Sequence, residues 1–197
     1  MARGDQPGEI YAPEEVRAIL AQCSRRAPTG IRDRALLTLI YRAGLRIGEA
    51  LELKVSDIDM RRGTIHIRRT KTRKDRWLAV GDGVLAVLQV WLDKRKELGL
   101  ARNGIPLFCT LQGSPVSYSA TDAMLKRRAA KAGVEKRVHL HGLRHSYAAG
   151  QRERGTDVET IRRQLGHTNL NTTQVYLDHI APADVLAIGR ADDWTDE

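Results

Sequence analysis

Three short segments carry more arginine, histidine and tyrosine than a hydrophobic core requires. They are residues 43–51 (AGLRIGEAL), residues 139–145 (HLHGLRH), and residues 165–167 (LGH) with a tyrosine nine positions further on. The side chains in them that could do chemistry are Arg46, His141, Arg144, His167 and Tyr176. The set combines cations, proton-transfer groups and a nucleophile, which together suit a reaction at a phosphate ester.

The two arginines and the tyrosine fit strand transfer on a phosphodiester. Negative charge grows on the phosphate oxygens in the transition state, and the guanidinium groups of Arg46 and Arg144 could clamp it bidentately. Tyr176 could form a reversible phosphate ester once its proton, with a reference pKa of about 10, is removed or shared. His141 and His167 could assist by proton transfer or hydrogen bonding. Glu49 is expected to orient a neighbouring basic group.

A strongly basic stretch supplies the remaining candidates. The chain of 197 residues has a formal net charge of +9, and residues 61–80 hold eight Lys or Arg against one acid. A focused patch of this kind favours a nucleic-acid partner, because each cation placed on a phosphate releases a counterion. Lys71 is the candidate proton donor to the leaving 5′-oxygen. The expected DNA-binding residues are Arg68, Arg69, Arg73, Lys74 and Arg76.

The rest of the composition excludes several classes of protein. Only Cys23 and Cys109 could form a disulfide or a thiolate site, and they lie far apart in apolar surroundings, so we expect two reduced core thiols. No apolar run approaches the roughly 20 residues that span a bilayer, and the N-terminus lacks the apolar block of a signal peptide. We therefore expect a cytoplasmic protein, acting at the prokaryotic nucleoid.

Apolar periodicity predicts mainly helices with one small sheet. Helical patterns begin at Pro13 and then cover residues 32–43, 84–98, 120–132, 142–154, 158–165 and 171–178, with a last short helix from Pro182. Alternating residues 64–67 and 77–80 predict two antiparallel strands joined by the basic turn 69–76. Trp77 and Trp91 are expected in the core, and His145 on a different part of its helix from His141. The fold class expected is α+β, mainly helical, with a small antiparallel β-sheet and a basic β-hairpin.

These segments resemble the tyrosine recombinases of the phage integrase and Xer type. The family's GLRxxEL, HxLRH and LGH boxes look like residues 44–50, 141–145 and 165–167, with Ala50 where leucine is usual. The family's hairpin lysine resembles Lys71, here flanked by threonines in place of the usual glycines, and its TTxxY segment resembles residues 172–176. The boxes occur in the right order, and the resemblance covers roughly residues 10–188.

The resemblance implies site-specific DNA recombination through a covalent 3′-phosphotyrosyl intermediate, with Arg46, Lys71, His141, Arg144, His167 and the nucleophile Tyr176 as the catalytic set. It implies no metal or other cofactor. The implied partners are a double-stranded DNA recombination site and other protomers on that DNA, in a tetrameric synapse that can exchange a C-terminal segment. By this reading residues 1–10 are an N-terminal extension, 11–190 the catalytic domain and 191–197 an acidic tail, without the N-terminal core-binding domain.

Two other functions compete with this interpretation. His139-Leu140-His141 has the His-hydrophobic-His pattern of metal-dependent HUH-type relaxases and nucleases, which place both histidines on a strand to hold a divalent metal. The other alternative is a non-catalytic DNA-binding accessory domain, against which the presence of both arginines and the tyrosine argues.

Overall fold

The computed structural model describes residues 10–68 and 75–166 of the chain. Its helices are α1 (Pro13–Ala21), α2 (Pro28–Ala43), α3 (Ile47–Glu52), α4 (Asp82–Glu97), α5 (Tyr118–Lys131), α6 (Leu140–Glu153) and α7 (Val158–Leu165). Its strands are β1 (Ile58–Asp59), β2 (Thr64–Ile67) and β3 (Arg76–Ala79), and a 3-10 turn covers Val55–Asp57. The mainly helical α+β architecture expected from the sequence is confirmed.

Local sequence signals account for several helix ends. Pro13 occupies the first turn of α1, and the Glu15 carboxylate accepts a hydrogen bond from the Ala12 amide at 2.8 Å, as in a capping box. The side chain of Asp157 caps α7 by accepting from the Thr160 amide at 2.9 Å. Helix α2 stops at Gly44, whose φ of 63° lies in the left-handed region that glycine adopts without strain. That turn directs the chain into Arg46 and α3.

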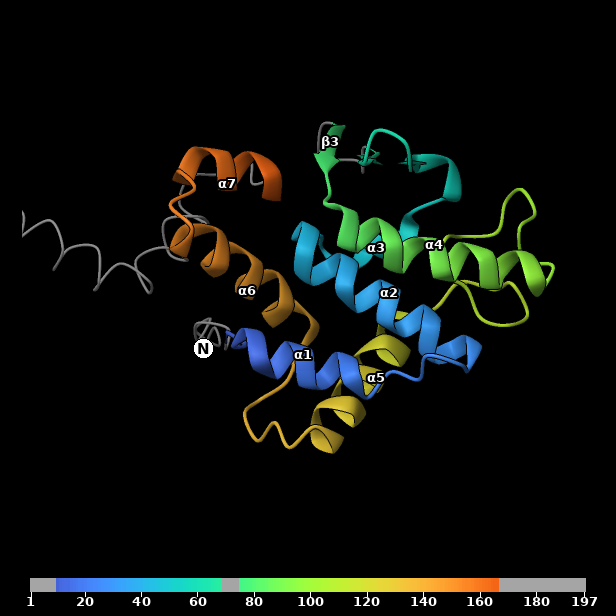
Figure 1. Ribbon diagram of the computed structural model, residues 1–197, viewed down its shortest axis with the longest axis horizontal. Coiled ribbons are helices and arrows are strands. Elements are labelled where there is room, and N and C mark those ends of the chain that lie inside the picture. Colours follow the sequence, from blue (N-terminus) through green and yellow to red (C-terminus); the bar gives the residue numbers. More distant parts are fainter. Residues whose placement is uncertain (1–9, 69–74, 167–197) are drawn as a thin grey trace, which may run out of the picture.

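Helix α2 is the central element of the core. Figure 1 shows it running through the middle of the described part, with α4 packed along one side and α1 along the other. Its residues 35–37, 39 and 40 are almost fully buried, so this helix has no wide polar face. On α4, Trp91 is fully buried and donates its indole N–H to the Leu107 carbonyl at 2.9 Å.

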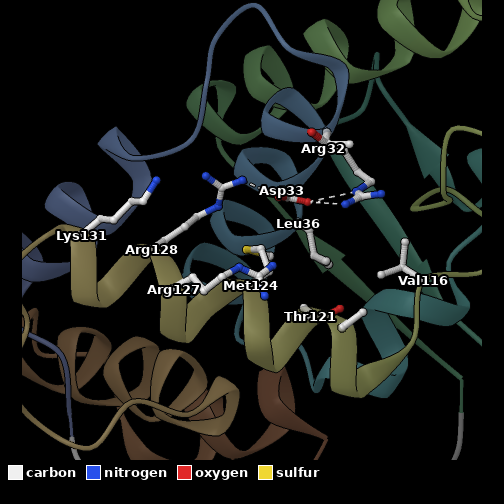
Figure 2. A pocket seen from close by; sticks show the side chains of 11 residues that line it. Arg32, Asp33, Leu36, Val116, Thr121, Met124, Arg127, Arg128 and Lys131 are labelled. Atoms are coloured by element: carbon white, nitrogen blue, oxygen red, sulfur yellow. Dashed lines mark hydrogen bonds and ion pairs between the residues drawn. The ribbon is translucent and has the colours of Figure 1, made fainter.

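A buried carboxylate ties α2 to α5. Asp33 on α2 accepts from the guanidinium groups of Arg32, at 2.7 Å, and Arg128, at 2.5 Å, which approach it from opposite sides (Figure 2). A buried carboxylate is tolerated when it is paired in this way. The three side chains therefore help to fix the end of α2 that lies furthest from Gly44.

The sheet is antiparallel with the strand order β1-β2-β3. Ile65, Ile67 and Leu78 are buried against the helices, and Ile67 pairs with Arg76. Arg76 therefore lies at the foot of the expected basic hairpin, whose residues 69–74 fall outside the described part.

Within the described residues the expected helices and strands are confirmed, with shifts of up to four residues at their ends, whereas the helices expected at residues 171–178 and from Pro182 lie outside the described part. The placement of Trp77 in the core was wrong: its side chain is 64% exposed and stacks on the ring of His66 at 4.4 Å. The short helix α3 was not predicted. Cys23 and Cys109 are buried free thiols, and burial raises the pKa of both, that of Cys23 to about 11. No described helix is both long and apolar enough to cross a bilayer.

Candidate active site

Arg46 lies at the N-terminal end of α3, two residues after the turn at Gly44. Its guanidinium donates from Nη1 to the Leu165 carbonyl at 3.0 Å and to Glu49 Oε1 at 3.2 Å. Its backbone amide donates to Glu49 Oε2 at 2.9 Å, which fixes the first turn of the helix. About a fifth of the side chain stays exposed, so the group is held in place and still open to a ligand.

Arg144 reaches the same point from α6. Its side chain is 1% exposed, and it donates from Nη1 to the Gly44 carbonyl and from Nη2 to the Leu165 carbonyl, both at 2.7 Å. The Leu165 carbonyl at the end of α7 thus accepts from both arginines. Residues 98 positions apart in the chain are brought together at one backbone oxygen.

Glu49 is the anion that holds this cluster of cations. Its carboxylate accepts from Arg46 and Arg76, and Arg144 Nη1 lies 3.8 Å away. Burial alone would raise the pKa of this carboxyl. Hydrogen bonds and charge from Arg76, the Arg46 amide and the charge of Arg144 outweigh burial and hold the pKa at about 2. The expectation that Glu49 orients basic neighbours therefore agrees with its geometry.

The cluster suits an anionic ligand. Three guanidinium groups surround one carboxylate, so a net positive charge remains in a largely buried setting where electrostatic interactions are strong. A phosphate at the exposed edge of Arg46 would meet fork-shaped donors already fixed in position.

His141 lies on the same helix as Arg144. It lies in the first turn of α6, exposed, three residues before Arg144, so the two side chains share a face of that helix. The His145 ring meets the His141 ring edge-on at 4.5 Å. The expectation that His145 lies on a different part of the helix was therefore wrong, because positions four apart are neighbours on a helix surface.

Residues 10–181 match the family model described as "Phage integrase family". The chain belongs to this family.

Similar proteins agree with this assignment. The chain is 37% identical over 185 residues to Tyrosine recombinase XerC 2 of Ralstonia nicotianae, covering 94% of this chain and 53% of that protein. It is 34% identical to Tyrosine recombinase XerD of Xanthomonas axonopodis pv. citri, covering 89% of this chain and 64% of that protein. The chain therefore spans about half to two thirds of the length of these relatives.

Solved structures show the same fold. The crystal structure of XerA recombinase matches with a TM-score of 0.80 at 26% identity, covering 95% of this chain and 66% of that one. The XerH site-specific recombinase, bound to palindromic difH substrate in a post-cleavage complex, matches with a TM-score of 0.78 at 25% identity, covering 96% and 54%.

Only part of the set expected for a phage integrase lies within the described residues. Arg46 and Arg144 converge on the Leu165 carbonyl, and His141 lies three residues before Arg144 on α6, whereas Lys71, His167 and Tyr176 lie outside the described part, as do Arg69, Arg73 and Lys74. The described chain ends at Gly166, directly after the carbonyl that both arginines contact. His167 is the next residue in the sequence.

The two described members of the expected DNA-binding set differ. The side chain of Arg68 is 54% exposed and donates to Asp57 at 2.5 Å, which leaves it accessible. The side chain of Arg76 is 13% exposed and turned inward onto Glu49. Sequence reasoning missed this inward contact, because Arg76 looks like any other cation of the basic stretch.

The histidine pair does not have the arrangement that an HUH-type site needs. His139 is the cap of α6 and accepts from the Gly142 amide through Nδ1 at 3.1 Å, and His141 lies in the helix itself. The two therefore do not lie side by side on a strand. Among residues 10–68 and 75–166, no three His, Cys, Asp or Glu side chains are grouped so that they could hold a metal ion.

A hollow of about 390 Å³ lies between α2 and α5, away from the predicted site residues (Figure 2). Its charged lining comprises Arg32, Asp33, Arg127, Arg128 and Lys131. Since Asp33 pairs with two of these cations, we assign this region to the packing of α2 against α5 and not to the chemistry.

Proposed function

We propose that this chain is the catalytic domain of a site-specific tyrosine recombinase, which cuts and rejoins DNA through a covalent bond to Tyr176. The observation that carries the proposal is the convergence of Arg46 and Arg144 on the Leu165 carbonyl. In a member of the phage integrase family, this convergence supports an anion clamp that is close in sequence to His167 and Tyr176.

The cleavage step balances with the side chains available. The Tyr176 oxygen attacks the phosphorus, and the bond from phosphorus to the 5′-oxygen breaks, leaving a 3′-phosphotyrosyl ester. The tyrosine proton passes to a neighbouring base, for which His141 and His167 are the candidates, and Lys71 protonates the departing 5′-oxygen. Arg46 and Arg144 stabilise the charge on the non-bridging oxygens. Attack by the 5′-hydroxyl of a partner strand reverses these steps and releases the tyrosine.

The fold prepares the arginines for this task before DNA arrives. Arg144 is buried and bonded to two backbone carbonyls, so its guanidinium does not have to reorganise in the transition state. Glu49 holds Arg46 in position by accepting hydrogen bonds from its backbone amide and its guanidinium. Arg68, Arg69, Arg73 and Lys74 serve as phosphate contacts that position the duplex without reading its sequence.

The proposed partners are a double-stranded DNA recombination site and further copies of the chain on that DNA. The solved XerH complex with difH substrate supports DNA as the substrate class. A tetrameric synapse with an exchanged C-terminal segment is the arrangement we propose for the assembled state.

A nicked suicide DNA substrate taken from the genomic neighbourhood of the gene tests the function. The cut releases a short strand that diffuses away, so the covalent complex accumulates and can be detected after denaturation in SDS. We expect the protein on the 3′ end of the cut strand, with undiminished yield in excess EDTA. An adduct on a 5′ end, or one that requires added divalent metal, would replace this proposal with the relaxase alternative.

A further inference from the structure

Arg76 lies in the basic stretch but faces the interior of the protein. It is the first residue of β3, and its guanidinium donates from Nη1 to Glu49 Oε1 at 3.0 Å and from Nη2 to Glu49 Oε2 at 2.9 Å. This is the two-point geometry in which arginine binds a carboxylate most strongly. With its Nε it donates to the Gln164 carbonyl at 3.1 Å. A side chain that is 13% exposed and engaged at three points has little left for a phosphate.

These contacts connect Arg76 to the clamp through two routes. Glu49 is also the carboxylate that holds Arg46. Gln164 directly precedes Leu165, so consecutive carbonyls at the end of α7 accept from Arg76 and from the Arg46–Arg144 pair. Carbonyls in the last turn of a helix lack partners within the helix, and here arginines from three other elements supply them.

The glycine that ends α7 is matched to this arrangement. Gly166 has a φ of 64°, and a Cβ added there would lie 2.8 Å from Nη1 of Arg76. Glycine at this position therefore allows the left-handed turn and also leaves room for the guanidinium.

We propose that Arg76 is a positioning residue, which fixes the Glu49 carboxylate and the end of α7 so that Arg46 is aimed at the scissile phosphate. Arg76 itself touches no DNA. The inference rests on the proposed recombinase function, and it replaces the expectation that Arg76 is a phosphate contact.

A double-mutant cycle on the cleavage rate at saturating DNA tests this role. Arg76→Gln should slow cleavage by about 10²-fold, since small misplacements of a catalytic group cost that much. In the Glu49→Gln background the same change should cost about tenfold or less, because the carboxylate route is gone and only the contact with the Gln164 carbonyl remains. Losses that simply multiply in the double variant would overturn the proposal.

Binding measurements separate positioning from phosphate contact. The slope of log affinity against log salt should be unchanged in Arg76→Gln, whereas losing one phosphate contact, as expected for Lys74→Gln, lowers it by about 0.9. A lowered slope in Arg76→Gln would mean that Arg76 binds DNA and would overturn the proposal.

A more conservative variant shows whether the Arg76→Gln result reflects a loss of folding. Arg76→Lys keeps the charge but not the fork, so its cleavage rate should lie between those of the unaltered protein and Arg76→Gln. A Lys variant no faster than the Gln variant would count against the proposal. If the unaltered protein cleaves DNA but the Arg76 variants do not behave as predicted, only the role of Arg76 is wrong. If the unaltered protein does not cleave, the proposed function fails first.

Discussion

Arg46 and Arg144 perform one proposed task from different surroundings. Arg144 is 1% exposed and held by backbone carbonyls, whereas Arg46 is partly exposed and held by a carboxylate. Substitution of Arg144 should therefore affect both stability and catalysis, because its partners become unsatisfied in the interior. Substitution of Arg46 should affect mainly catalysis.

For the clamp, we predict that Arg46→Ala and Arg144→Ala each slow covalent cleavage by at least about 10²-fold, the usual cost of one preorganised donor. Lysine at either position should also fall short, because a point charge cannot form a bidentate contact. Single-turnover cleavage at saturating DNA measures this, with Arg17→Ala on the exposed face of α1 as the control for lost charge. Wild-type rates in either alanine variant would remove that arginine from the site.

Glu49 should make stability depend on pH only in strong acid. Its folded pKa of about 2 lies below the ordinary glutamate value of 4.5, so its contribution to stability is complete above about pH 4.5 and is lost as the pH falls toward 2. Glu49→Ala leaves buried arginines without their anion and should lower the free energy of unfolding by about 3–5 kcal/mol at pH 7.

Urea denaturation measures this loss, with Glu52→Ala as the control on the exposed face of the same short helix. Equal stability of the Glu49 variant and the unaltered protein would contradict the assigned role of this carboxylate.

At the scale of elements, the basic stretch between β2 and β3 contains one proposed catalytic lysine among several other cations. A 5′-bridging sulfur is a good leaving group that needs no proton. Lys71→Ala should therefore be slow on ordinary DNA and largely rescued on the thio substrate. Lys74→Ala should cleave both substrates like the unaltered protein, apart from weaker binding at higher salt. Rescue of the Lys74 variant in place of Lys71 would show that the two lysines were assigned in the wrong order.

The regular elements could largely be predicted from the sequence, because they depend on local periodicity and end signals. Helix α7 was predicted with its observed ends, and α2 with its stop at Gly44. The short helix α3 was missed, since six residues show too little periodicity and its start depends on Glu49. Trp77 was misplaced because alternation in a strand does not by itself say which face is buried.

Residue types and spacing predicted candidates for the site, but not the contacts between them. Arg46, His141 and Arg144 stood out by their types and spacing, and the fold brings Arg46 and Arg144 onto one carbonyl, with His141 three residues before Arg144 on α6. The inward contact of Arg76 and the shared carbonyl of Leu165 left no signal in the sequence. Such contacts depend on tertiary packing between residues far apart in the chain, and on a backbone atom that every residue possesses.

At the scale of the whole molecule, assembly should depend on the C-terminal segment. Val185, Leu186 and Ile188 belong to a predicted helix too short to be stable alone, so it has to dock on its own or a neighbouring protomer. We predict a monomer in free solution and higher-order complexes only on DNA. Deleting residues 181–197 should leave binding of a single protomer nearly intact, weaken cooperative binding and alter cleavage.

Sedimentation with and without the recombination site measures the oligomeric state, and gel-shift titrations measure the cooperativity of DNA binding. A deletion that unfolds the domain would indicate docking within one protomer, and a deletion without any effect would make the segment dispensable.

The identity of the nucleophile is the central claim, and covalent capture on the nicked suicide substrate tests it most directly. Tyr176→Phe removes a single hydroxyl, so folding and DNA affinity should match the unaltered protein while the SDS-resistant adduct disappears. Tyr118→Phe, at an exposed tyrosine on α5, is the matched control and should form the adduct at the normal rate. An undiminished adduct in the Tyr176→Phe variant would contradict the account.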